Sequence, residues 1–109
     1  MEVKTLEEFF GKVLPSRFKP DKAAGTDVTV QIKITGTNES DWVVTINNQK
    51  LEAKKGTHPS PTLTLEMAET NFMELVNGEM SGEKAFLTGK LRFKGNIAVA
   101  LKLREAGFL

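Results

Sequence analysis

The chain has 109 residues, of which 39% are hydrophobic and 27% are charged. This size and composition indicate one globular domain, which buries roughly 65% of the surface that its unfolded chain exposes. Its 15 basic and 14 acidic side chains leave a formal net charge of +1, so overall charge gives no reason to expect nucleic-acid binding. The chain has no cysteine, which excludes disulfides, thiol catalysis and thiolate metal sites and fits an expected cytoplasmic location.

The first predicted element is a helix near the start of the chain. Thr5 to Glu8 have the pattern of a capping box, in which the threonine hydroxyl and the glutamate carboxylate satisfy free backbone amides. Apolar residues with helical spacing follow. Pro15 is expected to end this helix, because the residue before a proline is pushed out of the helical region. A short further turn of helix is expected over 20–24.

Four strands are predicted next, where the apolar residues change to a period of two. They cover 28–34, 42–46, the residues around 51–53, and 63–67. Asn47-Asn48 has the character of a tight hairpin turn between the second and third strands, because asparagine tolerates positive φ. The alternation predicts a sheet with one apolar face.

The last third of the sequence predicts two short helices, a strand and a final helix. The helices cover 69–76, ending at Gly78, and the stretch after Ser81 to Leu87, ending near Gly89. The fifth strand covers 90–94, and the final helix lies between a cap at Asn96 and a stop at Gly107.

The apolar residues of the final helix cover an arc of about 200°, whereas packing on one sheet needs about 100°. This helix therefore has two apolar neighbours: the sheet, and either another helix or a ligand cavity. Arg104 falls inside the arc and indicates that the last turn reaches solvent. Met67, Met73 and Met80 lie near several phenylalanines, and methionine suits both an adaptable cavity wall and ordinary gap filling in a core.

The residues give little support to catalysis. His58 is the one histidine, so no histidine–cysteine cluster exists to hold a metal. The serines lack a nucleophile-elbow context, and no phosphate-binding glycine loop is present. We therefore expect a protein that is not an enzyme and uses no cofactor.

Three cations alternate with apolar residues in the fifth predicted strand. Lys90, Arg92 and Lys94 are expected to share one strand face, with Leu91 and Phe93 on the other. This pattern is typical of a solvated edge strand. The alternative is docking to anionic lipid head groups or to an acyl-CoA phosphate. RNA binding ranks third, because Phe93 cannot stack beside cations on the opposite face.

Several motifs together resemble the sterol carrier protein type 2 domain family over almost the whole chain. They are FMELVNG at 72–78, AFLTGKL at 85–91, KGN at 94–96 and ALKL at 100–103, with Trp42 and the pair Arg17-Phe18. The resemblance implies one domain over 1–109. Its implied fold is α+β, with a five-stranded, mostly antiparallel sheet, helices on one face and a hydrophobic tunnel between them.

The resemblance also implies non-enzymatic binding and transfer of long-chain lipids: fatty acids, fatty acyl-CoA, sterols or phospholipids. With Met80 added from the methionine cluster, the implied lipid-binding residues are Phe72, Met73, Val76, Met80, Phe86, Leu91, Phe93, Ile97 and Leu101. Lys90, Arg92 and Lys94 are the expected contacts to head groups or to a transient anionic membrane surface. The alternative is an interaction or accessory module that acts with a lipid-metabolising enzyme, or a homodimerising domain.

The end of the sequence carries two further expectations. It lacks the peroxisomal signal of the family's eukaryotic members, which indicates a prokaryotic, cytoplasmic protein. Phe108 and Leu109 follow Gly107, which permits a sharp change of direction. Phe108 is therefore expected to fold back and close one end of the cavity, and the alternative is a frayed terminus.

Overall fold

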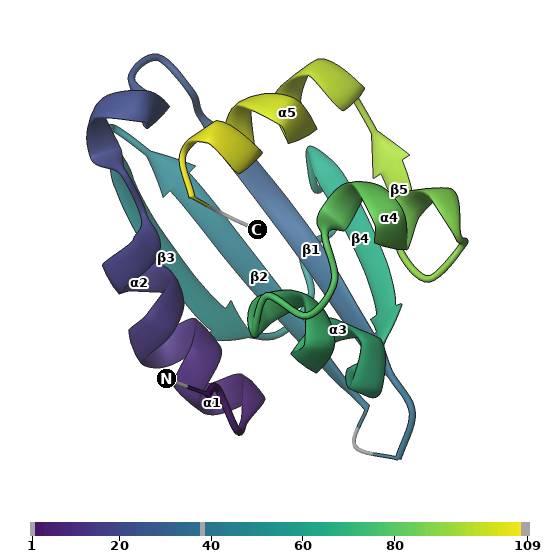
Figure 1. The fold of residues 1–109 in the computed structure, drawn as a ribbon. Coiled ribbons are helices and arrows are strands. Elements are labelled where there is room, and N and C mark those ends of the chain that lie inside the picture. Colours follow the sequence, from purple (N-terminus) through teal and green to yellow (C-terminus); the bar gives the residue numbers. More distant parts are fainter. Residues whose placement is uncertain (1, 38, 108–109) are drawn as a thin grey trace.

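The computed structural model describes residues 2–37 and 39–107 and contains a five-stranded sheet with helices on one face (Figure 1). The strands are β1 (Val28–Thr35), β2 (Ser40–Asn47), β3 (Lys50–Lys55), β4 (Leu63–Ala68) and β5 (Arg92–Gly95). They lie in the order β3-β2-β1-β4-β5, and neighbours are antiparallel except β1 and β4, which are parallel. This confirms the predicted α+β fold with a mostly antiparallel sheet.

The helices begin and end close to the predicted positions. They are α1 (Leu6–Glu8), η1 (Phe9–Val13), α2 (Leu14–Arg17), η2 (Pro20–Ala23), α3 (Glu69–Val76), α4 (Gly82–Leu87) and α5 (Ile97–Glu105). The Ser81 hydroxyl caps α4 by accepting a hydrogen bond from the Lys84 amide. The Asn96 side-chain oxygen caps α5 by accepting from the amides of Ala98 and Val99. Their side-chain oxygens satisfy amides that a first helical turn leaves without partners.

The prediction that Pro15 ends the first helix is wrong. The helical path continues through α2 to Arg17, and Phe18 then turns to extended backbone. Before Pro15 the helix widens into the π-helical turn η1, where the Leu14 amide donates to the Phe9 carbonyl. A proline ring normally clashes with the carbonyl four residues earlier, and a wider turn relieves that crowding.

Several strand boundaries also differ from the predictions, and β2 begins at Ser40 rather than at Trp42. The hairpin turn between β2 and β3 lies at Asn48 and Gln49, which have φ of 52° and 62°, one residue later than predicted. Strand β5 begins at Arg92 rather than at Lys90. The amides of Lys90 and Leu91 both donate to the carbonyl of Ala85, so these two residues belong to the turn that leaves α4.

Four aromatic side chains form the centre of the core on the β2 side of the sheet. The rings of Phe9 and Phe10 lie 5.5 and 5.8 Å from the ring of Phe72, which comes from α3. Phe10 also stacks on Trp42 of β2, with ring centroids 4.5 Å apart. Aromatic pairs at these spacings contribute beyond the area that they bury. This cluster joins the N-terminal helix and α3 to the sheet.

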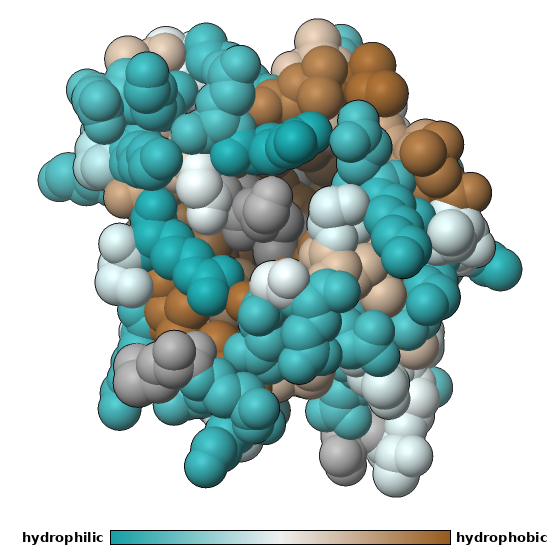
Figure 2. Space-filling view, in the orientation of Figure 1, coloured by the Kyte–Doolittle hydropathy of each residue, from teal (hydrophilic) through white to brown (hydrophobic). Residues whose placement is uncertain are grey.

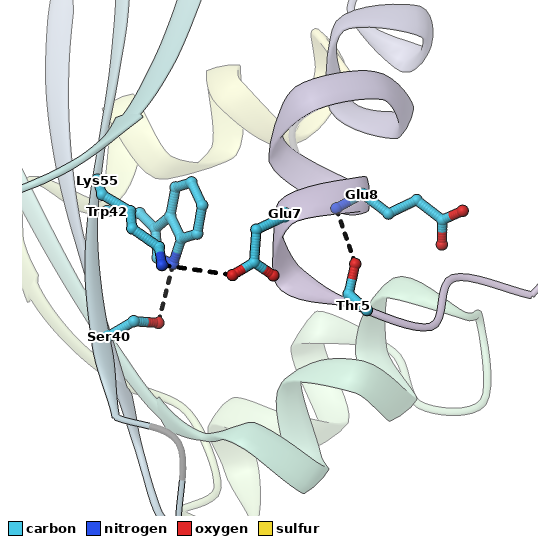
Figure 3. Close-up of polar contacts among 6 residues, drawn as sticks. All are labelled: Thr5, Glu7, Glu8, Ser40, Trp42 and Lys55. Atoms are coloured by element: carbon cyan, nitrogen blue, oxygen red, sulfur yellow. Dashed lines mark hydrogen bonds and ion pairs between the residues drawn. The ribbon is translucent and has the colours of Figure 1, made fainter.

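An exposed ion pair joins the N-terminal helix to the edge of the sheet, and further polar contacts lie within each element (Figure 3). The Lys55 ammonium on β3 lies 3.3 Å from the Glu7 carboxylate, and the Trp42 indole donates to the Ser40 hydroxyl. A backbone hydrogen bond and the Lys55 ammonium lower the pKa of Glu7 below its usual value. The Thr5 hydroxyl accepts from the Glu8 amide as predicted, but the Glu8 carboxylate accepts from the Lys4 amide instead of the Thr5 amide.

The C-terminal end of α5 is held against the segment that follows α2. The Lys19 amide donates to the carbonyl of Ala106, and Gly107 has φ of 89°. A Cβ added at Gly107 would clash with the carbonyl oxygen of Arg17. Gly107 therefore provides both a left-handed backbone and a close approach that a larger residue would prevent.

We predict that Gly107→Ala lowers the free energy of unfolding more than Gly78→Ala does. Gly78 has a similar φ of 78°, but nothing lies within 4 Å of a Cβ added there. Gly78→Ala should cost about 1–2 kcal/mol for the left-handed backbone alone. Gly107→Ala should cost about 1–3 kcal/mol more from overpacking.

Urea unfolding, followed by the fluorescence of Trp42 in the aromatic core, measures the free energy of unfolding of the wild type and of both variants. Equal losses would contradict a role for the contact with Arg17.

Candidate functional site: a hydrophobic cavity between α4 and α5

A cavity of about 360 Å³ lies between α4 and α5, above β4 and β5. Its lining residues are Leu63, Leu65, Gly82, Glu83, Phe86, Leu87, Leu91, Phe93, Ile97, Ala100, Leu101, Leu103 and Arg104. All of them are hydrophobic except Gly82 and the two charged residues Glu83 and Arg104. Figure 2 shows hydrophobic surface gathered over α5, in the upper right of the molecule.

The floor of the cavity comes from paired residues of β4 and β5. Leu65 lies opposite Phe93, and Leu63 lies opposite Gly95. A Cβ added at Gly95 would lie 2.6 Å from the Leu63 side chain and 2.8 Å from the Thr62 carbonyl oxygen. A glycine at this position therefore lets β5 pair closely with β4 while the leucine fills the floor.

The walls come from helices that use only part of their apolar surface for packing. On α5, Leu103 is buried, whereas Ile97 and Leu101 are 61% and 54% exposed. On α4, Ala85 is fully buried, whereas Phe86 is 49% exposed. Ile97, Leu101 and Phe86 all line the cavity, so the second apolar neighbour of the final helix is the cavity.

The structure brings together five of the nine residues that the sequence assigned to lipid binding. Phe86, Leu91, Phe93, Ile97 and Leu101 line the cavity.

The other four do not line it. Phe72, Val76 and Met80 are buried in the core, and Met73 is half-buried against it. The reason for Phe72 is its contact with two aromatic side chains of the N-terminal helix. Phe72, Met73 and Val76 all lie on α3, which packs over β1 and β4 in the middle of the sheet (Figure 1). The residues that line the cavity come instead from α4, α5, β4, β5 and their connections. Met80 follows α3 in the chain and is 8% exposed.

Sequence reasoning missed several lining residues. They are Leu63, Leu65, Gly82, Glu83, Leu87, Ala100, Leu103 and Arg104. For Arg104 a signal was present, because it falls inside the apolar arc of α5, but this was interpreted only as the last turn of the helix reaching solvent. Leu63 and Leu65 belong to the apolar face of a predicted strand, but a period of two does not tell which part of the sheet a helix leaves uncovered.

The three cations of the predicted fifth strand do not share one strand face. Lys90 precedes β5, whereas Arg92 and Lys94 lie within it. Phe93 lines the cavity, and side chains alternate along a strand, so Arg92 and Lys94 point to the opposite face of the sheet. The Arg92 guanidinium lies 3.8 Å from the Glu66 carboxylate. Lys90 and Arg92 also border a second, more polar cleft at this edge, with Glu66 and Asn71.

The described residues add three observations about chemistry. Residues 2–37 and 39–107 contain no group of three or more histidine, cysteine or acidic side chains that could hold a metal ion. Within the same ranges, no helix has the length and apolar character that crossing a membrane requires. The His58 amide donates to the Gln31 side chain, and its ring Nδ1 accepts from the Ser60 amide, so His58 helps to shape the loop between β3 and β4.

The predicted closing residue Phe108 lies outside the described residues.

Comparisons with known proteins agree with this architecture. The chain matches the SCP-2 sterol transfer family over residues 7–106. Sterol carrier protein 2 of Homo sapiens is 35% identical over 70 residues, which are 64% of this chain and 13% of the human protein. The chain thus spans a small part of the length of that curated relative.

Two solved structures show the same fold. The NMR structure of palmitated SCP2L2 from Aedes aegypti has a TM-score of 0.71 at 23% identity and covers 96% of this chain and 93% of that one. The stereoselective inverting sec-alkylsulfatase Pisa1 from Pseudomonas sp. has a TM-score of 0.80 at 20% identity and covers 94% of this chain and 16% of that one. The family match and the shared fold confirm the resemblance seen in the sequence: the chain belongs to the SCP-2 sterol transfer family of lipid-binding and lipid-transfer domains.

Proposed function

We propose that this chain binds a long-chain fatty acid or fatty acyl-CoA in the α4–α5 cavity and carries it without chemical change. The observation that carries the proposal is the cavity lining, in which hydrophobic side chains from two helices and two strands face one space. The palmitated state named for the similar protein from Aedes aegypti supports the same ligand class. SCP-2 domains are generally lipid carriers rather than enzymes, and the sequence offers no catalytic group that argues otherwise.

The cavity suits an acyl chain in size and chemistry. A volume of about 360 Å³ is at the lower end of the range of roughly 300–1,000 Å³ that is typical of ligand sites. Each buried methylene contributes about 0.8 kcal/mol, so a long chain binds without directional polar contacts. The lining has few groups that distinguish one apolar ligand from another, and sterols and phospholipids are therefore further candidate ligands.

Arg104 is the residue of the cavity that suits an anionic head group. It lines the cavity from the last turn of α5, three residues after Leu101. Residues three apart are neighbours on a helix surface, so a carboxylate at the mouth lies near the guanidinium when the chain contacts Leu101. Lys90, Arg92 and Lys94 remain a separate proposal for head-group contact. Lys90 and Arg92 border the polar cleft beside β5, and Lys94 lies further along the strand.

A second candidate function is that of an accessory module for a lipid-metabolising enzyme. The observation that favours it is the coverage of the relatives: the matched region is 13% of the human protein and 16% of the sulfatase chain. A domain that occurs within longer proteins is suited to pass lipid to a neighbouring catalytic domain. We propose a cytoplasmic location for either role.

We predict that Leu101→Gln weakens the binding of a fluorescent fatty acid about tenfold or more, because an unpaired amide against the acyl chain costs about 1–3 kcal/mol. Leu101 is 54% exposed, so the free energy of unfolding should change little. Fluorescence titration measures the affinity, and urea unfolding measures the stability.

The matched control is Met73→Gln on α3, which is half-buried and does not line the cavity. It should leave the affinity close to that of the wild type. An equal loss of affinity in both variants would place the acyl chain along α3 as well and would contradict a site confined to the α4–α5 cavity.

We also predict that Arg104→Gln weakens fatty-acid binding by up to about fivefold, as expected for a partly solvated charge pair worth about 0.2–1 kcal/mol. Binding of the uncharged fatty alcohol of equal length should not change. Lys102→Gln is the matched control, because Lys102 is exposed on the same helix but does not line the cavity. Equal effects of Arg104→Gln on the acid and the alcohol would exclude recognition of the carboxylate.

A further inference from the structure

Two charged side chains, those of Glu83 and Arg104, belong to the lining of a cavity whose other side chains are hydrophobic. Glu83 lies in the first turn of α4, and Arg104 lies in the last turn of α5. They have opposite signs and come from opposite walls of one site. A site for hydrocarbon alone needs no charge, so this pair indicates which head group the site accepts.

Both charges lie on the helix face that borders the cavity. Glu83 precedes Phe86 by three residues on α4, and Arg104 follows Leu101 by three residues on α5. Residues at this spacing are neighbours on a helix surface. Phe86 and Leu101 line the cavity as well, so each helix carries an apolar wall residue and a charge side by side.

The two charges lie towards one end of the cavity. The helices α4 and α5 run in opposite directions beside it (Figure 1), so the first turn of α4 and the last turn of α5 lie towards the same end. The other end is formed by Leu87, the last residue of α4, and Ile97, the first residue of α5. One end of the cavity is thus charged and the other is apolar, which matches the two ends of an amphiphile.

Neither charge has an ionic partner in the part of the chain that the structure describes. The ion pairs there join Lys55 to Glu7 and Arg92 to Glu66. Glu83 and Arg104 are both exposed and do not pair with each other. Both groups are therefore available to the charges of a ligand.

Helix stability accounts for these two residues only in part. An acidic residue is favourable in the first turn of a helix, and a basic residue is favourable in the last turn. This effect explains where along its helix each charge lies. It does not explain why both charges lie on the cavity side, because a position facing solvent in the same turn would serve a helix end equally well.

The size of the cavity favours a ligand with one hydrocarbon chain. Its volume of about 360 Å³ is near the lower limit of the range of roughly 300–1,000 Å³ that is typical of ligand sites. Leu63 and Leu103, its most deeply buried lining residues, are 1% and 3% exposed and close the floor. A lipid with two chains carries twice the hydrocarbon, so a single-chain lipid fits this space better.

The pair of charges opposes a head group of a single sign. A carboxylate is attracted to Arg104 and repelled by Glu83, and an ammonium group has the reverse balance. A head group with one positive and one negative charge is attracted by both side chains at once. The pair therefore favours zwitterions.

We propose that the cavity binds a single-chain amphiphile with a zwitterionic head group, whose anionic group lies beside Arg104 and whose cationic group lies beside Glu83. This inference rests on the proposed function, which places an acyl chain in the same cavity, and it narrows the class of ligand. A phosphate or a carboxylate supplies the negative charge of such a head group, and a quaternary ammonium group supplies the positive charge.

The test is calorimetric titration with four ligands of similar chain length, below the concentrations at which they form micelles. Dodecylphosphocholine and lauroylcarnitine are zwitterions, dodecanoate is an anion and dodecylammonium is a cation. The wild type should bind one or both zwitterions about two- to thirtyfold more tightly than either singly charged ligand, as two exposed charge pairs allow. The zwitterion with the higher affinity identifies the anionic group as phosphate or carboxylate.

Two variants should shift the singly charged ligands in opposite directions. Glu83→Gln should strengthen the binding of dodecanoate and weaken that of dodecylammonium, each by up to about fivefold. Arg104→Gln should do the reverse. Damage to the fold weakens the binding of all ligands alike, so it does not produce this pattern. The matched control is Glu52→Gln on β3, an exposed residue that does not line the cavity, and it should leave the order of affinities unchanged.

The outcomes separate this inference from the proposed function. Equal affinities of the wild type for all four ligands would overturn the assignment of the head group and leave the lipid-carrier function intact. A Glu83→Gln variant that binds all four more weakly by the same factor would also overturn it and would assign Glu83 to the stability of α4. A wild type that binds none of the four and no fluorescent fatty acid would overturn the proposed function, and this inference with it.

Discussion

The packing of Phe72 against Phe9 and Phe10 is the contact on which the rest of the structure depends. It joins the N-terminal helix, α3 and, through Phe10 and Trp42, the sheet into one core. The aromatic side chains fill the space above the β2 side of the sheet. The apolar face of β4 and β5 is thereby left to α4 and α5, and these two helices do not fill it. The same interaction that stabilises the fold thus determines where the cavity lies.

The helix α5 is fixed at its C-terminal end while its cavity side stays open. Leu103 and Ala106 are buried. The Lys19 amide donates a hydrogen bond to the Ala106 carbonyl, and Gly107 packs on the backbone of Arg17. Ile97, at the other end, is more than half exposed. A helix held by one end and one face can keep an apolar wall facing open space without losing its place on the sheet.

The sequence predicted local features well because their causes are local. The helix 69–76, the caps at Ser81 and Asn96 and the glycine stops depend on neighbouring residues. The positions of the cavity walls depend on distant ones. Phe72 and Phe86 are both aromatic residues on short helices, and only the contacts of Phe72 with the N-terminal helix place it in the core. The start of β5 was missed for a different, local reason: the Ala85 carbonyl accepts hydrogen bonds from the amides of Lys90 and Leu91, which holds both residues in the turn after α4.

The wide apolar arc of α5 has a physical meaning that the sequence left open. A buried helix with two packing partners and a helix beside an open cavity have the same periodicity, because periodicity records which residues are apolar and not what covers them. Exposure separates the two cases: Leu103 is 3% exposed and Leu101 is 54% exposed on the same helix. Natural domains cover most large apolar side chains, so this exposed wall implies that its covering comes from outside the described fold. The lipid proposed for the cavity supplies such a covering, because it removes the inward-facing part of this apolar surface from water.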